Sequence, residues 1–277
     1  MTTDRILITG SEGVIGSYCH FGNHLNKSSL DVTDFSAVMT KVLEYRPDIV
    51  IHLAALTDLT ICERDAARAY SVNAAGTYHV ALAVRRIGAK LVYVSTSGVF
   101  DGTKTEPYIE EDTPSPVNVY GRSKYLGELA VSGILQDYLI VRTSWLFGGG
   151  QVRDKKFVGK IMSQLAVSEV RAVEDRRGSP TYAKDLVQAI MRLLDEEKKG
   201  IYHMSNQGNA TRFDVAKEII SLTGARAHVV PVRSDAFSSA YRTGENESMA
   251  SRVTYMRPWR EALAEYIRTE WHDIKTV

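Results

Sequence analysis

Tyr120 and Lys124, four residues apart in the sequence, are the pair of side chains best suited to moving a proton. Of the fourteen tyrosines, Tyr120 alone is followed by a lysine at that distance. On a helix the two side chains would share a face, and the ammonium group would lower the phenol pKa from its ordinary value near 10. Tyr120 could then exchange a proton with a substrate oxygen while a hydride moves at the attached carbon. A surface tyrosine–lysine pair on an amphipathic helix is the alternative interpretation.

Three glycines near the amino terminus have the spacing of a phosphate-binding turn. Gly10, Gly13 and Gly16 directly follow the apolar run 6–9. In a strand–turn–helix unit such glycines let the backbone turn tightly and approach a pyrophosphate, and the helix amino terminus presents free N–H groups to it. We expect Gly10 to make the turn, Gly13 to allow the close approach and Gly16 to let the helix pack on the strand. The alternative is a tight turn that binds no ligand.

The hydrophobic pattern predicts the framework that would hold these residues. Short β-branched runs alternate with stretches of helical periodicity; the runs are 6–9, 48–54, 90–95 and 138–143, and the helical stretches are 34–45, 63–87 and 119–134. This alternation predicts an α/β fold built on a Rossmann-like, doubly wound parallel sheet.

Beyond about residue 150 the alternation is less regular. Helical patterns occupy 157–167, 183–194, 212–222 and about 258–271, and strand patterns occupy 201–205 and 228–232. We therefore expect a dinucleotide-binding domain at 1–150 and a smaller, mixed α/β substrate-binding lobe at 151–277. Parts of 183–205 are expected to complete the first sheet.

Composition excludes several classes of function. The 277 residues carry a formal net charge of +1 with scattered basic residues, so we expect no nucleic-acid partner. No apolar run approaches the roughly 20 residues of a membrane helix, and the polar amino terminus does not resemble a signal peptide; we expect a cytoplasmic protein that binds no membrane. The two cysteines, Cys19 and Cys62, are too few for a disulfide framework and match no metal-ligand spacing.

The glycine spacing after Thr9, together with the Tyr-x-x-x-Lys pair about a hundred residues later, resembles the extended short-chain dehydrogenase/reductase family. Further stretches resemble one branch of it, the dTDP-4-dehydrorhamnose reductases, over nearly the whole chain. These stretches are RPDIV (46–50), LAALTD (53–58), STSGVFDG (95–102), PVNVYGRSK (116–124), RTSWLFG (142–148) and GSPTY (178–182).

The resemblance implies reduction of a nucleotide-linked 4-keto-6-deoxy sugar with NADPH or NADH as hydride donor. It assigns catalysis to Thr96, Tyr120 and Lys124, with Ser97 as the rival of Thr96. Substrate binding would fall to Thr96, Ser97, Trp145 and Asn246. Tyr120 and Lys124 would also contact the cofactor, with these further residues: Gly10, Glu12, Gly13, Val14, Ile15, Gly16, Asn26, Lys27, Asp31, Val32, Leu53, Ala54, Ala55 and Thr57.

The sequence departs from the family pattern in three places. Ser97 and Gly98 replace the usual Asp-Tyr, and the segment 242–248 is more acidic than the usual Arg-Pro-x-Asn-Ser element. The chain between Gly16 and Leu30 is also short, so either the first helix loses about two turns or the second strand is vestigial. That short segment has no carboxylate before residue 31 to bind a ribose 2′-hydroxyl, and Asn26 and Lys27 would accept a 2′-phosphate, so we expect NADPH.

Other interpretations stay open. The chain could be a sugar-nucleotide epimerase of the same extended family, or a non-catalytic regulator resembling the β subunit of methionine adenosyltransferase. No carboxylate cluster has a recognisable ligand spacing, so no metal site is predicted and a magnesium requirement is left open. Small and apolar residues on the predicted helices 63–87 and 119–134 suggest a homodimer, and the resemblance to the extended family implies that these helices pair across a two-fold axis. The alternative is that both helices only pack on the sheet. The residues suggested for the interface are Ala74, Ala75, Ala81, Ala83, Leu126, Leu129 and Ala130.

Overall fold

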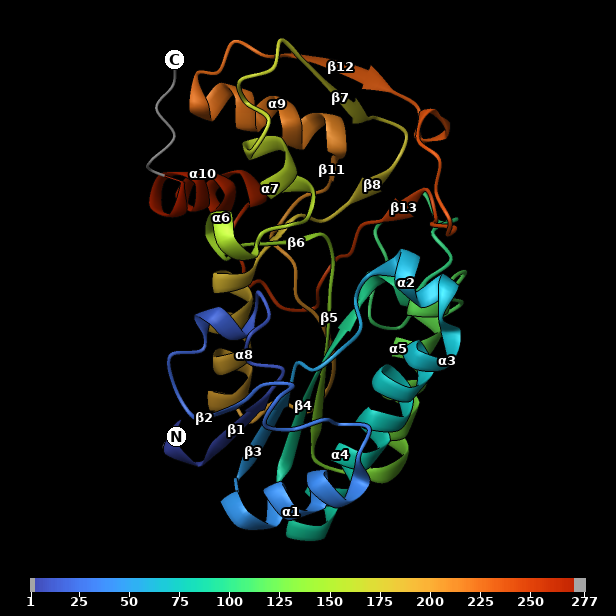
Figure 1. The fold of residues 1–277 in the computed structure, drawn as a ribbon, viewed down its shortest axis with the longest axis vertical. Helices are drawn as coiled ribbons and strands as arrows, with labels where there is room; N and C mark the ends of the chain where they lie inside the picture. The colour runs from blue at the N-terminus through green and yellow to red at the C-terminus, as the bar shows by residue number, and fades with distance from the viewer. Residues whose placement is uncertain (1–2, 272–277) are drawn as a thin grey trace.

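The computed structural model describes residues 3–271, and its centre is a six-stranded parallel sheet of order β10-β5-β4-β3-β1-β2 (Figure 1). Its strands are β1 (Ile6–Thr9), β2 (Asn23–Leu25), β3 (Ile49–His52), β4 (Lys90–Thr96), β5 (Tyr138–Thr143) and β10 (Gly200–His203). All neighbouring pairs run parallel. The Rossmann-like fold predicted from the sequence is confirmed, and β10 comes from the second half of the chain.

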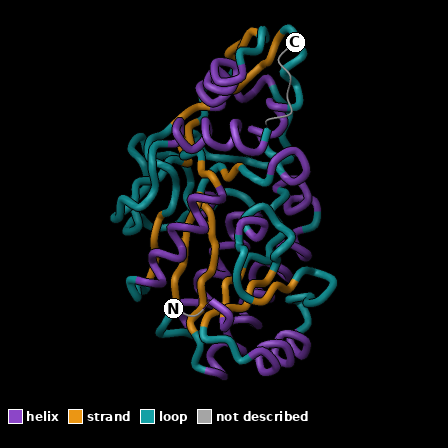
Figure 2. Tube along the Cα trace, turned by 90° about the vertical axis from the view of Figure 1, so that its left-hand side faces the viewer, coloured by secondary structure: helices purple, strands orange, loops and turns teal. Residues whose placement is uncertain are grey.

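Helices cover both faces of this sheet, which explains why its strands read as continuous apolar runs. On one face lie α1 (Phe35–Tyr45), α4 (Gly76–Ile87) and α5 (Val119–Ile134), and on the other lies α8 (Ala183–Asp195) (Figures 1 and 2). Alternate residues of each strand enter the two cores: Leu91 packs toward α4 and α5, and Val92 packs toward α8. No helix in the described range is long and apolar enough to span a membrane.

The prediction of one helix over 63–87 is wrong. The segment forms α2 (Leu59–Arg64), α3 (Ala66–Tyr70), a π-helical turn (Ser71–Ala75) and then α4. Asp65 separates α2 from α3, because its side chain accepts a hydrogen bond from the Arg68 backbone N–H and so caps the start of α3. The apolar periodicity continues across this break, so periodicity alone does not show it.

The prediction of a helix after the glycine run is also wrong. Only a short 3-10 turn (Gly16–Tyr18) separates the run from β2, which pairs with β1 along its three residues. The shortened segment has therefore lost the first helix and kept the second strand.

The remaining residues form a smaller layer above the carboxyl edge of the sheet (Figure 1). Its own core gathers Phe147, Tyr182, Trp259 and Tyr266. The helix predicted over 157–167 ends at Met162. The elements of this layer are β6 (Leu146–Phe147), α6 (Gly150–Arg153), α7 (Phe157–Met162), β7 (Glu169–Val173), β8 (Arg177–Gly178), β9 (Thr181–Tyr182), β11 (Ala210–Thr211), α9 (Arg212–Thr223), β12 (His228–Val232), β13 (Asn246–Glu247) and α10 (Trp259–Glu270).

Candidate active site

A cavity of about 660 Å³ lies at the carboxyl ends of the sheet strands, where the two layers meet. The sheet contributes residues at the ends of β1, β4 and β5, among them Gly10, Thr96 and Thr143. The smaller layer contributes side chains from several separate segments. In open parallel sheets ligands bind at this edge, so the cavity is the candidate active site.

The glycine run forms one wall of the cavity, and its three glycines differ in what surrounds them. Gly10 has φ +69°, and a Cβ there would lie 2.5 Å from the backbone nitrogen of Ala54. A Cβ on Gly16 would lie 2.2 Å from the carbonyl oxygen of Ser11. A Cβ on Gly13 would meet only the Gly10 carbonyl oxygen, at 3.4 Å. Gly10 and Gly16 are therefore required by the protein's own packing, whereas Gly13 leaves space free in the cavity wall.

The same wall offers hydrogen-bond donors to an anion. Although the predicted helix is missing, the backbone N–H groups of Val14 and Ile15 have no partner within residues 3–271, and both residues line the cavity. Unpaired N–H groups in a tight turn bind phosphate oxygens. The turn therefore fits a dinucleotide pyrophosphate by its shape and its donors.

We expect Gly13→Val to weaken dinucleotide binding at least about tenfold and to leave the melting temperature nearly unchanged, because the new side chain would occupy the phosphate position. Fluorescence titration with NADPH measures the first effect and thermal melting the second. Gly10→Ala is the matched variant and should instead lower the melting temperature, since its Cβ meets backbone. Wild-type affinity in Gly13→Val would mean that the glycine run only turns the chain.

All but one of the predicted cofactor residues line the cavity. Asn26 does not: its amide donates to Glu12 Oε1 at 2.7 Å, and its Oδ1 accepts the Ser29 backbone N–H at 3.0 Å. Asn26 thus holds the turn after β2 in place instead of facing a ligand. The cofactor residues that line the cavity are Gly10, Glu12, Gly13, Val14, Ile15, Gly16, Lys27, Asp31, Val32, Leu53, Ala54, Ala55, Thr57, Tyr120 and Lys124.

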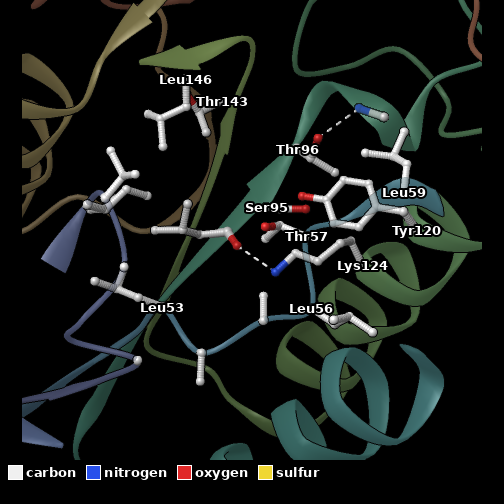
Figure 3. Close-up of a pocket in the computed structure, with 18 of the residues that line it drawn as sticks. Leu53, Leu56, Thr57, Leu59, Ser95, Thr96, Tyr120, Lys124, Thr143 and Leu146 are labelled. Carbon is white, nitrogen blue, oxygen red and sulfur yellow. Dashed lines mark hydrogen bonds between the residues drawn. The ribbon is translucent and has the colours of Figure 1, made fainter. Parts of the chain in front are cut away.

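Helix α5 carries Tyr120 and Lys124 to the cavity because its first turn is closely packed. Asn118 caps the helix by accepting the Gly121 N–H at 2.8 Å. A Cβ on Gly121 would lie 2.0 Å from the carbonyl oxygen of Gly98, so only glycine lets the helix approach the turn after β4 this closely. The approach places Tyr120 beside Thr96, with the phenol directed toward the end of β4 (Figure 3).

The environment shifts both titratable groups of the pair. Burial raises the pKa of the Tyr120 phenol to about 12, a shift that the Thr96 hydroxyl opposes. Lys124 donates to the Val94 carbonyl oxygen at 2.8 Å and lies 4.1 Å from the centre of the Tyr93 ring. Burial lowers the pKa of Lys124 to about 7, and the carboxylate of Glu128 acts against this shift.

A buried ion pair anchors α5 to the sheet below Lys124. Glu128 accepts two hydrogen bonds from Arg142 of β5, from Nε at 2.9 Å and from Nη2 at 2.7 Å. Both side chains are almost fully buried. A two-point contact of this kind fixes the helix against β5, and it keeps the position of Lys124 constant relative to the sheet edge.

The predicted substrate residues divide into two groups. Ser97 and Trp145 line the cavity with Thr96. Asn246 does not, contrary to the prediction: it is 5% exposed, its amide donates to the carbonyl oxygens of Lys104 and Glu106, and its Oδ1 accepts the Ser248 N–H. Successive side chains of a strand point to opposite sides, and the next residue, Glu247, lines the cavity in its place.

Sequence reasoning missed several further cavity residues. Arg68, Lys156 and Arg212 bring positive charge to the lining from segments far apart in the chain. The hydroxyls of Ser95 and Thr143 are buried and have no hydrogen-bond partner among the described residues. Ser95 and Thr143 lie in two of the family stretches quoted above, whereas Arg68, Lys156 and Arg212 belong to no motif, so only the fold could bring these cations to the cavity. No group of three metal-ligating side chains lies within residues 3–271.

Comparison with known proteins decides the family. The model of the RmlD substrate binding domain matches residues 4–271. The chain belongs to that family. A *Bacillus subtilis* (strain 168) relative, the spore coat polysaccharide biosynthesis protein SpsK, is 35% identical over 95% of this chain and 97% of its own length. The dTDP-4-dehydrorhamnose reductase of *Mycobacterium tuberculosis* (strain CDC 1551 / Oshkosh) is 37% identical over 95% and 92%.

A solved structure of an RmlD-family protein agrees with this assignment. The dTDP-4-dehydrorhamnose reductase of *Bacillus anthracis* str. Ames, solved in complex with NADP, superimposes with a TM-score of 0.92 at 35% identity, covering 96% of this chain and 99% of that one. The resemblance drawn from the sequence motifs is confirmed.

Proposed function

We propose that this chain reduces a dTDP-linked 4-keto-6-deoxy sugar at C4 with NAD(P)H as hydride donor, as in the conversion of dTDP-4-dehydrorhamnose to dTDP-rhamnose. The observation that carries the proposal is the meeting of Thr96, Tyr120 and Lys124 at one cavity with the glycine run. The family assignment and the names of the two reductases above support it.

The proposed mechanism gives each side chain a separate task. The Thr96 hydroxyl and the Tyr120 phenol hydrogen-bond the keto oxygen and orient the carbonyl carbon. A bound nicotinamide supplies the hydride that this carbon accepts. Tyr120 donates its proton to the oxygen as negative charge develops there, and the Lys124 ammonium stabilises the phenolate that is left. Lys124 itself is buried, with 3% of its surface exposed.

The two alternatives, a sugar-nucleotide epimerase and a non-catalytic regulator, differ from the reductase in their use of cofactor. A reductase oxidises NADPH in proportion to the keto sugar supplied, an epimerase turns over without net consumption, and a regulator does neither. Absorbance of NADPH, followed with dTDP-4-dehydrorhamnose present and absent, separates a reductase from the other two. Analysis of the sugar nucleotide after incubation separates an epimerase, which changes it, from a regulator, which does not. Consumption that depends on the keto sugar is expected.

The cavity also supports a choice between the two cofactors. Lys27 follows the end of β2, lines the cavity and is exposed, and its ammonium could reach a 2′-phosphate. We infer a preference for NADPH.

The two parts of the chain would have different tasks. Residues 1–150 would bind the dinucleotide, and the smaller layer from the region 151–277 would hold the sugar nucleotide.

Lys27→Ala should remove most of an about tenfold preference for NADPH and leave turnover with NADH nearly unchanged, because only NADPH carries the phosphate that the ammonium binds. Added salt should reproduce part of the loss, since the contact faces solvent. The measurement is kcat/KM for both cofactors, with Lys41→Ala on α1 as the control. A wild-type preference for NADH, or an NADPH preference untouched by Lys27→Ala, would contradict this assignment.

We also propose that the protein is a cytoplasmic homodimer. On α5 the side chains of Leu126 and Leu129 are 45% and 48% exposed, and Tyr78 of α4 is 47% exposed. Ala81 and Ala83, which the sequence suggested for the interface, instead pack in the core of the sheet. Exposed apolar side chains on two helices that pack against each other favour an isologous contact.

Light scattering at micromolar concentration should give a dimeric mass for the wild type and a monomeric mass for Leu126→Arg combined with Leu129→Arg. Both arginines would place charge in the proposed contact, and neither position belongs to the buried core. A monomeric wild type would rule out the dimer.

A further inference from the structure

Trp145 lines the cavity, and two other residues pack closely against its indole ring. On one side lies Gly178, where a Cβ would come within 2.2 Å of the ring. The guanidinium carbon of Arg212 lies over the ring, 3.6 Å from its centre. The backbone of Trp145 adopts φ +39°, which is uncommon for a residue with a bulky side chain. The protein therefore holds this ring rigidly, and its polar edge is the part left to act.

That edge contacts Glu247. The indole Nε1 donates to Glu247 Oε2 at 2.6 Å. The backbone of Glu247 is fixed independently, because β13 pairs with β8 and the Ser144 hydroxyl donates to the Glu247 carbonyl oxygen at 3.0 Å. Glu247 is the register partner of Gly178, the residue beneath the indole ring. Main chain and side chain are thus held by separate contacts.

One carboxylate oxygen of Glu247 remains available in the cavity. Oε1 accepts no hydrogen bond and forms no ion pair within residues 3–271, although the residue lines the cavity. The charge of Glu247 raises the pKa of Tyr120 and that of Arg212, although burial dominates the shift in both cases. The carboxylate therefore lies within electrostatic reach of both the catalytic phenol of Tyr120 and the guanidinium of Arg212.

We propose that Glu247 determines specificity for the sugar, with its free Oε1 accepting hydrogen bonds from ring hydroxyls of the substrate. The inference rests on the proposed function, because the ligand is taken to be a nucleotide-linked sugar. A carboxylate can only accept hydrogen bonds, and sugar hydroxyls are the donors that such a ligand carries. The diphosphate is excluded from this position by its charge, and Lys156 and Arg212 line the same cavity to receive it. Trp145 is the positioning residue that orients the carboxylate.

The test compares two probes, dTDP-rhamnose and dTDP, which differ by the sugar. Calorimetric titration of Glu247→Gln in the presence of NADP should show about tenfold weaker binding of dTDP-rhamnose and unchanged binding of dTDP, since a charge-assisted acceptor is replaced by a neutral group. Glu247→Ala removes both oxygens and should lose more. Trp145→Phe keeps an aromatic ring but removes the indole N–H, so it should weaken binding of dTDP-rhamnose alone. Glu245→Gln, exposed and outside the cavity, is the matched control and should bind both probes normally.

The outcomes separate this inference from the proposed function. If the wild type bound dTDP-rhamnose and reduced the keto sugar, and Glu247→Gln and Glu247→Ala kept wild-type affinity, the role of Glu247 alone would be wrong. Equal losses for dTDP and dTDP-rhamnose would also overturn it, because they would indicate general damage to the cavity. A wild type that neither bound dTDP-rhamnose nor consumed NADPH with the keto sugar would overturn both.

Discussion

Tyr120→Phe should lower kcat for the keto sugar at least about a hundredfold, with the fold and the affinity for NADPH retained. The substitution removes one hydroxyl, and loss of a positioned general acid typically costs a factor of this size or more. Tyr120 is half-buried and lines the cavity, so the phenylalanine ring fills the same space. Steady-state kinetics at saturating NADPH measure the effect, and fluorescence titration measures cofactor affinity.

Tyr125→Phe is the matched control for this variant. Tyr125 lies on the same helix but packs against the separate cluster that contains Phe100 and Tyr108. We expect its kcat to stay within about twofold of the wild type, as for a substitution that removes no group from the cavity. If Tyr120→Phe turned over as fast as Tyr125→Phe, Tyr120 would not be the proton donor.

Lys124→Met should have the second largest effect, in both catalysis and cofactor binding. The substitution removes the cation that favours the Tyr120 phenolate in the proposed mechanism, so the ionisation seen in the pH–rate profile should move to higher pH. NADPH binding should weaken as well, because we assign Lys124 a contact with the cofactor. A pH–rate profile identical to that of the wild type would refute the electrostatic role.

The same variant makes a prediction about stability, with a defined sign. Burial lowers the Lys124 pKa in the folded chain to about 7 from 10.5. Between these values the unfolded chain binds more protons than the folded chain, so the free energy of unfolding of the wild type rises with pH by up to about 1.4 kcal/mol per pH unit. Methionine has no proton to release. The stability of Lys124→Met relative to the wild type should therefore be greatest near pH 7 and decline toward pH 10.

Urea denaturation of both proteins without cofactor, at pH values spanning this range, measures the difference. Lys217→Met, at an exposed position of α9, is the control and should show no such trend. A stability difference that stayed constant with pH would show that Lys124 is not held in a buried, destabilised charged form.

The sequence predicts well those features that depend on neighbouring residues. The strand at 138–143 is found with the predicted bounds, because an uninterrupted β-branched run can be buried only as a central strand. Tyr120 and Lys124 are brought to one cavity because helix geometry relates i and i+4 directly. Glycine spacing likewise predicted a turn whose shape and free N–H groups fit a phosphate.

Features that depend on tertiary contacts could not be predicted. The helix break at Asp65 depends on one side-chain cap, and the apolar period runs through it. Chain length alone does not decide between the loss of the first helix and the loss of β2, since either loss shortens the chain equally. The family pattern has an asparagine in this segment and so points to Asn246, but strand alternation turns Asn246 away from the cavity. Arg212 enters the site only because α9 begins beside Trp145.

The most direct test of the central claim uses NADPH deuterated at the transferred position and dTDP-4-dehydrorhamnose as substrate. Mass spectrometry of the product, with NADPH absorbance followed in parallel, shows whether hydride reaches the sugar. A reductase gives a product that carries one deuterium at C4, in an amount equal to the NADPH oxidised, and Tyr120→Phe should form it far more slowly. Sugar product without deuterium, or no product with NADPH left intact, would contradict the proposed reduction.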